Sequence, residues 1–249
     1  MDTQKLLSYL RQCIKKYNMI QEGDKIAIGL SGGKDSMTLL YGLKKLQSFY
    51  PKHFDLVAIY VNLNVNDSMD AVDTMSKVCE ELDVPFYHVN TDIYQIIFKE
   101  RKEKNPCSLC AKMRKGALNE KALSLGCNKI AYAHHKNDFI ETSMMSLIYE
   151  GRYYCFPPVT YLDKTGLTII RPMLYIDEKE VRGYAFKNNL PVLSNPCPAD
   201  GYTKRQEIKE FIEQNTKQFP DIKRNLNAAL LNYFDKNAKM QKNAEDIFL

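Results

Sequence analysis

The sequence KIAIGLSGGKDS, residues 25–36, decides the fold of this chain. Its first half is an apolar run typical of a buried strand, and leucines at helical spacing follow it. Between them, two adjacent glycines allow positive φ and let a charged oxygen approach the main chain. Two serines and a lysine add hydroxyls and an ammonium group near a helix N-terminus. The segment therefore predicts a phosphate-binding loop.

A tight turn followed by a capped helix is the structural alternative. A turn needs one glycine and a cap needs one hydroxyl or carboxylate. This loop supplies more: Ser31, Gly32, Gly33, Lys34, Asp35 and Ser36. It differs from the Walker pattern because its glycines are adjacent and Asp35 follows Lys34. It resembles the PP-loop of the ATP pyrophosphatase superfamily, S-G-G-x-D-S, at every fixed position. That resemblance implies ATP cleaved between its α and β phosphates, with an adenylylated substrate as intermediate.

Composition is that of a soluble globular protein. The chain has 249 residues, 45% hydrophobic and 26% charged, enough for one large core or a core with a small appendage. No apolar run reaches the roughly 18 residues of a membrane span, and the first twenty residues carry charge throughout. We therefore expect a cytoplasmic protein with no membrane partner. The net charge of +5 permits RNA binding without demanding it.

Apolar periodicity predicts an α/β fold, a parallel sheet with helices on both faces. The expected strands are residues 25–30, 55–63, 86–89, 129–133 and 168–170. The expected helices are residues 3–17, 37–47, 70–82, 107–125, 138–149, 178–188, 204–214 and 222–234. We predict a short N-terminal helix in residues 1–20, an ATP-binding domain in 21–175 and a mainly helical C-terminal region in 176–249. The chain after Asp235 is expected to be loosely ordered.

Seven cysteines, an odd number, argue against a disulfide framework. Cys107 and Cys110 form a C-x-x-C pair that can reach one metal centre, although a redox dithiol, half a zinc site, two Fe–S ligands or chance all fit the pattern. Cys197 lies between prolines and offers a third thiol, and Cys155 is left open as a fourth. Three thiolates with an open position suit a reactive cluster, whereas four suit structural zinc. The remaining cysteines are expected in the core: Cys13, Cys79 and Cys127.

Four further blocks are CSLCAKMRKGAL, KIAYAHHKNDFIETSMMSLIYEGR, IIRPMLYIDEKEV and PCPADGYTKRQ. Together with the PP-loop they resemble the tRNA 2-thiocytidine synthetase family, an Fe–S-dependent sulfur-transfer branch of the superfamily, from about residue 23 to 211. The resemblance implies an adenine nucleotide alpha hydrolase-like fold that uses ATP and Mg²⁺, with a 4Fe-4S cluster on Cys107, Cys110 and Cys197. It implies that the C2 oxygen of an anticodon-loop cytidine in tRNA is adenylated, then replaced by sulfur delivered from the fourth iron.

Roles for single residues follow from the same resemblance and from the motifs. The residues predicted to contact the nucleotide are Leu30, Ser31, Gly32, Gly33, Asp35, Ser36, Val61 and His135. Those predicted to be catalytic are Lys34, Asp35, Arg114 and Asp138. Arg114 follows Cys110 by one helical turn and shares its face. The family pattern reads His-His-x-Asp-Asp, and this chain has Asn137 where the family has the first Asp. An amide can bind a metal but cannot take a proton, so the acidic role falls to Asp138.

RNA is expected to meet basic clusters at residues 44–45, 99–104, 112–115 and 204–205, with stacking on Tyr153, Tyr154 and Phe156. The sulfur donor is expected to be a cysteine desulfurase product or free sulfide, and a homodimer is possible.

Two other functions fit parts of the sequence. One is a PP-loop ligase or amidotransferase with zinc or no metal at the cysteines; the other is a sulfur carrier or Fe–S desulfurase that acts on free thiolated bases.

Overall fold

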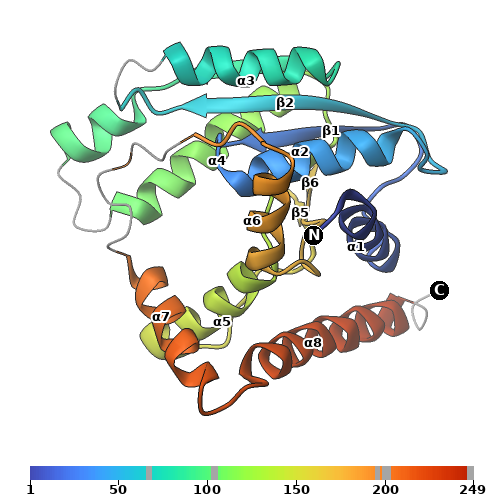
Figure 1. Ribbon diagram of the computed structural model, residues 1–249, viewed down its shortest axis with the longest axis vertical. Helices are drawn as coiled ribbons and strands as arrows, with labels where there is room; N and C mark the ends of the chain where they lie inside the picture. The colour runs from blue at the N-terminus through green and yellow to red at the C-terminus, as the bar shows by residue number, and fades with distance from the viewer. Residues whose placement is uncertain (66–68, 102–105, 194–196, 198–202, 246–249) are drawn as a thin grey trace.

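The computed structural model describes residues 1–65, 69–101, 106–193, 197 and 203–245, the segment 237–245 by its backbone alone. Within these residues one six-stranded sheet has the order β3-β2-β1-β4-β6-β5 (Figure 1). The strands are β1 (Asp24–Leu30), β2 (Phe54–Asn62), β3 (Phe86–Asn90), β4 (Lys129–Ala131), β5 (Val159–Leu162) and β6 (Leu167–Ile170). All neighbours are parallel except β5, which is antiparallel to β6. The predicted α/β fold is confirmed.

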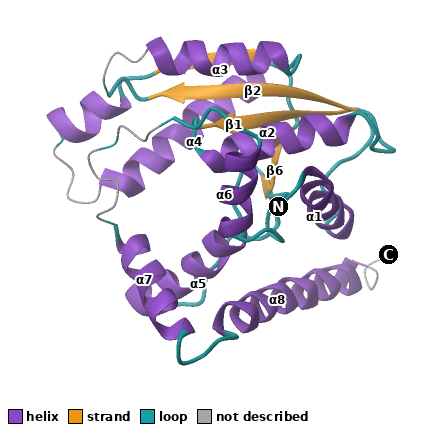
Figure 2. Ribbon diagram, viewed as in Figure 1, coloured by secondary structure: helices purple, strands orange, loops and turns teal. Residues whose placement is uncertain are grey.

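Helices cover both faces of the sheet (Figure 2). They are α1 (Thr3–Lys16), α2 (Lys34–Gln47), α3 (Met69–Glu81), the π-helical turn η1 (Gln95–Glu100), α4 (Pro106–Ser124), α5 (Lys136–Glu150), α6 (Glu178–Lys187), α7 (Lys204–Thr216) and α8 (Ile222–Glu245). Because side chains alternate along a strand, Ile26 and Ile28 pack into the core beneath α1, α2 and α3, whereas Ala27 packs with α4 and η1 on the opposite face.

Several elements differ from the sequence-based expectation. The edge strand β5 and the turn η1 were not predicted. Helix α2 begins at Lys34, directly after Gly33, instead of three residues later. Helix α8 continues to Glu245, beyond the expected end at residue 234 and through part of the tail expected to be loosely ordered. Helix α1 shares one core with α2, and the division of the chain into three regions stays a prediction.

Helices α5, α7 and α8 form a second layer beside the sheet domain (Figure 1). Helix α5 packs against both α7 and α8, and α7 also packs against α8. None of the helices in the described part of the chain combines the length and apolarity needed to cross a membrane.

A buried ion pair fixes the amino ends of β1 and β4. The Asp24 carboxylate lies 2.7 Å from Lys129 Nζ and accepts a hydrogen bond of 2.8 Å from Asn128 Nδ2. Lys129 Nζ also donates to the Met19 carbonyl oxygen at 2.8 Å. Both charged side chains are at most 10% exposed, so each depends on the other for compensation of its charge.

Asp24→Ala is therefore expected to lower the free energy of unfolding by about 3 kcal/mol, because it leaves the Lys129 ammonium buried without its carboxylate. Urea unfolding followed by circular dichroism measures the change. Glu150→Ala breaks the exposed pair with Arg152 and is expected to leave stability almost unchanged. Equal losses in both variants would contradict this role of Asp24.

Candidate functional site

The predicted phosphate loop is a closed set of hydrogen bonds between β1 and α2. Ser31 N–H donates to Ser36 Oγ at 3.1 Å, and Ser36 Oγ donates to the Gly33 carbonyl oxygen at 3.0 Å. Gly32 has a φ of +75°, which a residue with a side chain rarely adopts. Gly33 precedes α2, and no described side chain caps this helix. The N–H groups of its first turn are therefore available to an anion.

A cavity of about 340 Å³ opens at the carboxyl ends of β1, β2 and β4. Seven of the residues predicted for the site line it: Leu30, Ser31, Asp35, Ser36, Val61, Arg114 and Asp138. Apolar side chains beside the loop, including Ile59 and Leu118, complete the wall and suit an adenine ring. The periodicity placed them in an expected strand and an expected helix, and only the fold shows that they line the cavity.

A second cavity, of about 280 Å³, adjoins the first. Ser31, Val61 and Arg114 line both. The second is also lined by Gly33, Leu193 and Cys197. The third cysteine of the predicted cluster therefore lies beside the phosphate loop, although the two are far apart in the sequence.

Cys110 is close enough to the other two predicted ligand cysteines to feel their charge. Cys107 is exposed in the first turn of α4, and Cys110 is half-buried. Burial raises the pKa of Cys110, the charge of Arg114 opposes that rise, and negative charge on Cys197 or Cys107 adds to it. Arg114 therefore favours the thiolate form, which binds metals.

The predicted donor set consists of three thiols. Among the described residues, no group of three His, Cys, Asp or Glu side chains is close enough together to hold a single metal ion. A four-iron cubane is wider than one ion and takes ligands that stand farther apart. Cys197 lines the smaller cavity, and Cys110 lies near enough to Cys197 and Cys107 to feel their charge, so the three thiols are candidate ligands of such a cluster with one iron unligated by protein.

Cys155 lies in the core, not with these thiols. It is 6% exposed, its Sγ donates to the Phe139 carbonyl oxygen at 3.2 Å, and burial raises its pKa to about 12. It is therefore no fourth ligand. The predicted burial of the other three cysteines is confirmed: Cys13, Cys79 and Cys127.

The paired histidines at the end of β4 have different surroundings. His135 is the N-cap of α5, and its Nδ1 accepts a hydrogen bond of 3.3 Å from the Asp138 N–H. His134 lines the larger cavity instead. Burial lowers the pKa of His134 to about 3, so this imidazole is neutral. In the described chain neither cavity is lined by His135, and its contact with nucleotide stays a prediction.

The aromatic segment after α5 divides between surface and core. Phe156, expected as a stacking surface for RNA, is 9% exposed and stacks on His134 with ring centroids 4.5 Å apart. That expectation was wrong, because the strand β5 that follows folds this segment inward. Tyr153 and Tyr154 are 46% and 47% exposed and stay available for stacking.

Asp35 has the chemistry of a metal ligand. Its Oδ2 accepts a hydrogen bond of 3.0 Å from Lys34 Nζ, whereas its buried Oδ1 accepts none in the described structure and lies 3.6 Å from His135 Nε2. A buried carboxylate oxygen without a hydrogen bond, on a residue that lines the nucleotide cavity, suits Mg²⁺. Lys34 itself lies 3.3 Å from Glu178 Oε1 and, among the described residues, does not line either cavity.

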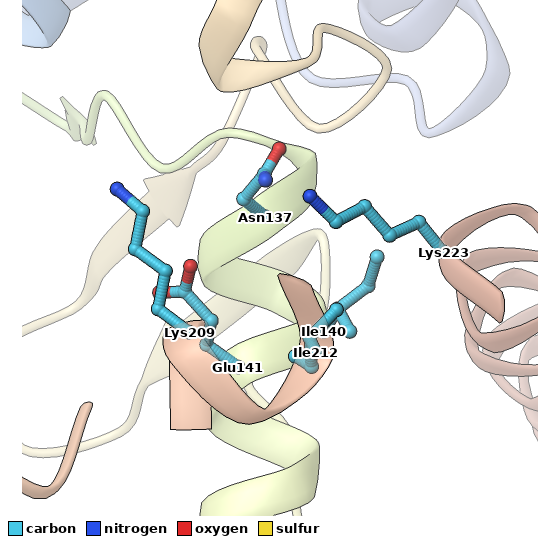
Figure 3. A pocket seen from close by; sticks show the side chains of 6 residues that line it. All are labelled: Asn137, Ile140, Glu141, Lys209, Ile212 and Lys223. Atoms are coloured by element: carbon cyan, nitrogen blue, oxygen red, sulfur yellow. The ribbon is translucent and has the colours of Figure 1, made fainter. Parts of the chain in front are cut away.

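Glu178, at the start of α6, was not predicted from the sequence. Besides Lys34, its carboxylate lies 2.8 Å from Lys209 Nζ and 3.2 Å from Arg182 Nη2. Burial raises its pKa, but the hydrogen bond from Lys209 and the charge of Lys34 outweigh burial and lower it to about 2. Its N–H donates to Asn137 Oδ1 at 3.0 Å, so the amide that departs from the family pattern joins α5 to α6. Figure 3 shows Asn137 and Lys209 around a small cavity between α5, α7 and α8.

Comparison with known proteins agrees with this geometry. Residues 3–216 match the family model of the PP-loop domain. A tRNA-cytidine(32) 2-sulfurtransferase of Paraburkholderia phymatum is 36% identical over 230 residues, which cover 92% of this chain and 68% of that protein. One of Citrifermentans bemidjiense is 34% identical over 224 residues, or 89% of this chain and 87% of that protein.

A solved structure is similar over most of the chain. It is the U34-tRNA thiolase NcsA from Methanococcus maripaludis with its 4Fe-4S cluster. The TM-score is 0.77 at 25% sequence identity, over 93% of this chain and 79% of the other.

The depressed pKa of Glu178 predicts a pH-dependent loss of stability. A carboxyl group with a folded-state pKa of about 2, against an ordinary 4.5, stabilises the fold above pH 4.5 and loses that effect as the pH falls toward 2. Glu178→Gln is therefore expected to cost about 2 kcal/mol at neutral pH and progressively less below about pH 5. Urea unfolding of both proteins between about pH 3 and 7 measures the difference. A difference that does not vary with pH would contradict this prediction.

Proposed function

The chain belongs to the tRNA-cytidine(32) 2-sulfurtransferase family of PP-loop proteins, and on that basis we propose that it replaces the C2 oxygen of a tRNA cytidine by sulfur at the expense of ATP. The observation that carries the proposal is the shared lining of the two cavities. The phosphate loop, Arg114 and Cys197 meet there, so activation by ATP and sulfur transfer have a common site.

ATP binds with its phosphates on the loop and its adenine between the apolar strand ends. N–H groups of the loop and the first turn of α2 donate to phosphate oxygens, and the hydroxyls of Ser31 and Ser36 lie within the same loop. Val61 and Leu118 supply the apolar wall for the adenine. Mg²⁺ would be held by Asp35 and would offset phosphate charge during transfer.

Adenylation is an exchange of bonds at the α-phosphorus. The C2 oxygen of the cytidine bonds to this phosphorus, the bond to the oxygen bridging the α and β phosphates breaks, and pyrophosphate leaves. Arg114 faces both cavities and stabilises the negative charge that develops on the α-phosphate. Asp138 lines the nucleotide cavity, but its carboxylate also holds the His135 N–H at 2.9 Å and Arg205 at 3.1 Å, so it positions the loop after β4 as well.

In the second half of the reaction sulfide attacks C2, the C2–O bond breaks and AMP leaves. A 4Fe-4S cluster held by Cys107, Cys110 and Cys197 would supply that sulfide from the iron without a protein ligand. The protein's part is to keep the thiols beside the adenylated oxygen. Adenylation makes the oxygen a good leaving group, and Arg114 stabilises the charge on the departing AMP.

The proposed partners are a tRNA substrate and a sulfur donor. tRNA is the substrate of the family, and the exposed Tyr153 and Tyr154 support stacking of unpaired bases. Sulfide, either free or derived from a cysteine desulfurase product, is the proposed source of sulfur. A homodimer and a cytoplasmic location stay predictions.

Removal of Cys197 tests the function in cells. In cells lacking the protein, the wild-type chain is expected to restore 2-thiocytidine in tRNA and Cys197→Ala is not, because the cluster loses a ligand. The matched control is Cys155→Ala, which removes a core thiol and is expected to retain thiolation. Nucleoside mass spectrometry of purified tRNA measures both. Full thiolation by Cys197→Ala, at equal protein levels, would overturn the proposed role of this thiol.

Removal of the Arg114 guanidinium tests the adenylation step. Arg114→Met is expected to lower kcat by about 100-fold, a typical effect of losing one donor to developing charge. Lys121→Met removes a cation from the last turn of the same helix, outside the predicted RNA-binding clusters, and is expected to change kcat little. ATP-dependent release of pyrophosphate in the presence of tRNA measures the step. A similar kcat in both variants would contradict the assignment of Arg114.

A further inference from the structure

Leu193, four residues before Cys197 in the sequence, is hydrogen-bonded to the phosphate loop. The Leu193 N–H donates to the Gly32 carbonyl oxygen at 2.9 Å. The Leu193 side chain covers Gly32 so closely that a Cβ atom on the glycine would stand 2.7 Å from Leu193 Cδ1. The φ of Gly32 and this contact both require glycine at the position. The loop main chain and Leu193 are therefore in direct contact.

The helix that follows Cys197 is also attached near the nucleotide cavity. Lys209 of α7 pairs with Glu178 at 2.8 Å, and Glu178 in turn pairs with Lys34 at 3.3 Å. Arg205 of the same helix pairs with Asp138 at 3.1 Å, and Asp138 lines the cavity. Along the sequence, Cys197 therefore lies between Leu193 and helix α7. Both contact residues of the phosphate loop or of the nucleotide cavity.

We propose that Leu193 is a positioning residue that couples occupancy of the phosphate loop to the position of Cys197. The Gly32 carbonyl belongs to the same peptide unit as the Gly33 N–H. In the structure this N–H donates to Ser31 Oγ at 3.3 Å. A phosphate that accepts from it instead carries negative charge, so it polarises the peptide more strongly and strengthens the hydrogen bond from the Leu193 N–H to the carbonyl. Bound ATP therefore holds the chain that carries the third thiol.

The coupling must act in both directions. If nucleotide favours one position of Cys197, fixing Cys197 in that position raises nucleotide affinity by the same factor. ATP and sulfur would then be brought together in the same molecules of enzyme. This consequence rests on the proposed function, because it needs Cys197 to be a cluster ligand, whereas the coupling itself does not.

The test uses the full chain without a cluster and the α,β-methylene analogue of ATP with Mg²⁺. The rate of alkylation of each cysteine is followed by peptide mass spectrometry, and binding of the analogue by calorimetry. In the wild-type chain the analogue is expected to slow alkylation of Cys197 by at least about fivefold. Leu193→Ala keeps the N–H but removes the side-chain packing over Gly32 that holds it on the carbonyl, so the analogue still binds but the protection is expected to fall to less than about twofold. Leu193→Met, which keeps an apolar side chain of similar size, is expected to retain it.

Two comparisons separate coupling from simple shielding. Val192→Ala changes the neighbouring exposed side chain and is expected to keep the wild-type protection. Full protection of Cys197 in Leu193→Ala with the analogue bound would mean that nucleotide shields the thiol directly, and would overturn the proposal. If Leu193→Ala does not fold or bind, Leu193→Val takes its place, with protection between those of the alanine and wild-type chains as the supporting result and wild-type protection as the overturning one.

Failure of this proposal is distinguishable from failure of the proposed function. Alkylation is measured without iron, so protection that depends on Leu193 can be found even in a chain that never assembles a cluster. Conversely, a chain that thiolates tRNA with Leu193→Ala showing undiminished protection would keep the function and lose the coupling.

Discussion

The chemistry of this protein depends on the parallel pairing of β1 with β4. Ile28 of β1 lies opposite Ala131 of β4, so the segments that leave the two strands emerge at one edge of the sheet. One is the phosphate loop and the other carries the two histidines and Asp138. The strand order changes direction at this pair, which is where open α/β sheets bind ligands. The cavity, the phosphate site and the position of α4 all follow from that adjacency.

Structural features that depend on short stretches of sequence could be predicted, whereas features that depend on contacts between distant residues could not. The loop and the parallel strands follow from glycine chemistry and apolar periodicity within short windows. The edge strand β5 is four residues long and pairs with β6 alone, so its own sequence does not predict it. Which histidine lines the cavity depends on the turn after β4, and no local pattern shows that it is His134. Glu178 lies in a block that resembles the family but that suggested no role for it, and Leu193 lies in none of those blocks. Only the fold brings the two residues to Lys34 and Gly32.

Charged contacts link the helices α5, α6 and α7 to the nucleotide site. Acidic and basic side chains alternate from Lys34 through Glu178 to Lys209, and a second set joins Asp138 to Arg205. Asn137 accepts the Glu178 N–H, so the amide at this position has a structural partner that needs no negative charge. The departure from the family pattern is thus compatible with the site, because Asp138 and Asp35 supply the carboxylates.

The metal content of anaerobically purified protein tests most directly whether three distant thiols meet at the ATP site as ligands of one cluster. About four irons per chain with a broad visible absorption band are expected from the wild-type chain. Cys197→Ala is expected to lose both, and Cys155→Ala to retain both. A colourless protein that contains zinc in place of iron, with the same metal content in all three chains, would contradict this arrangement.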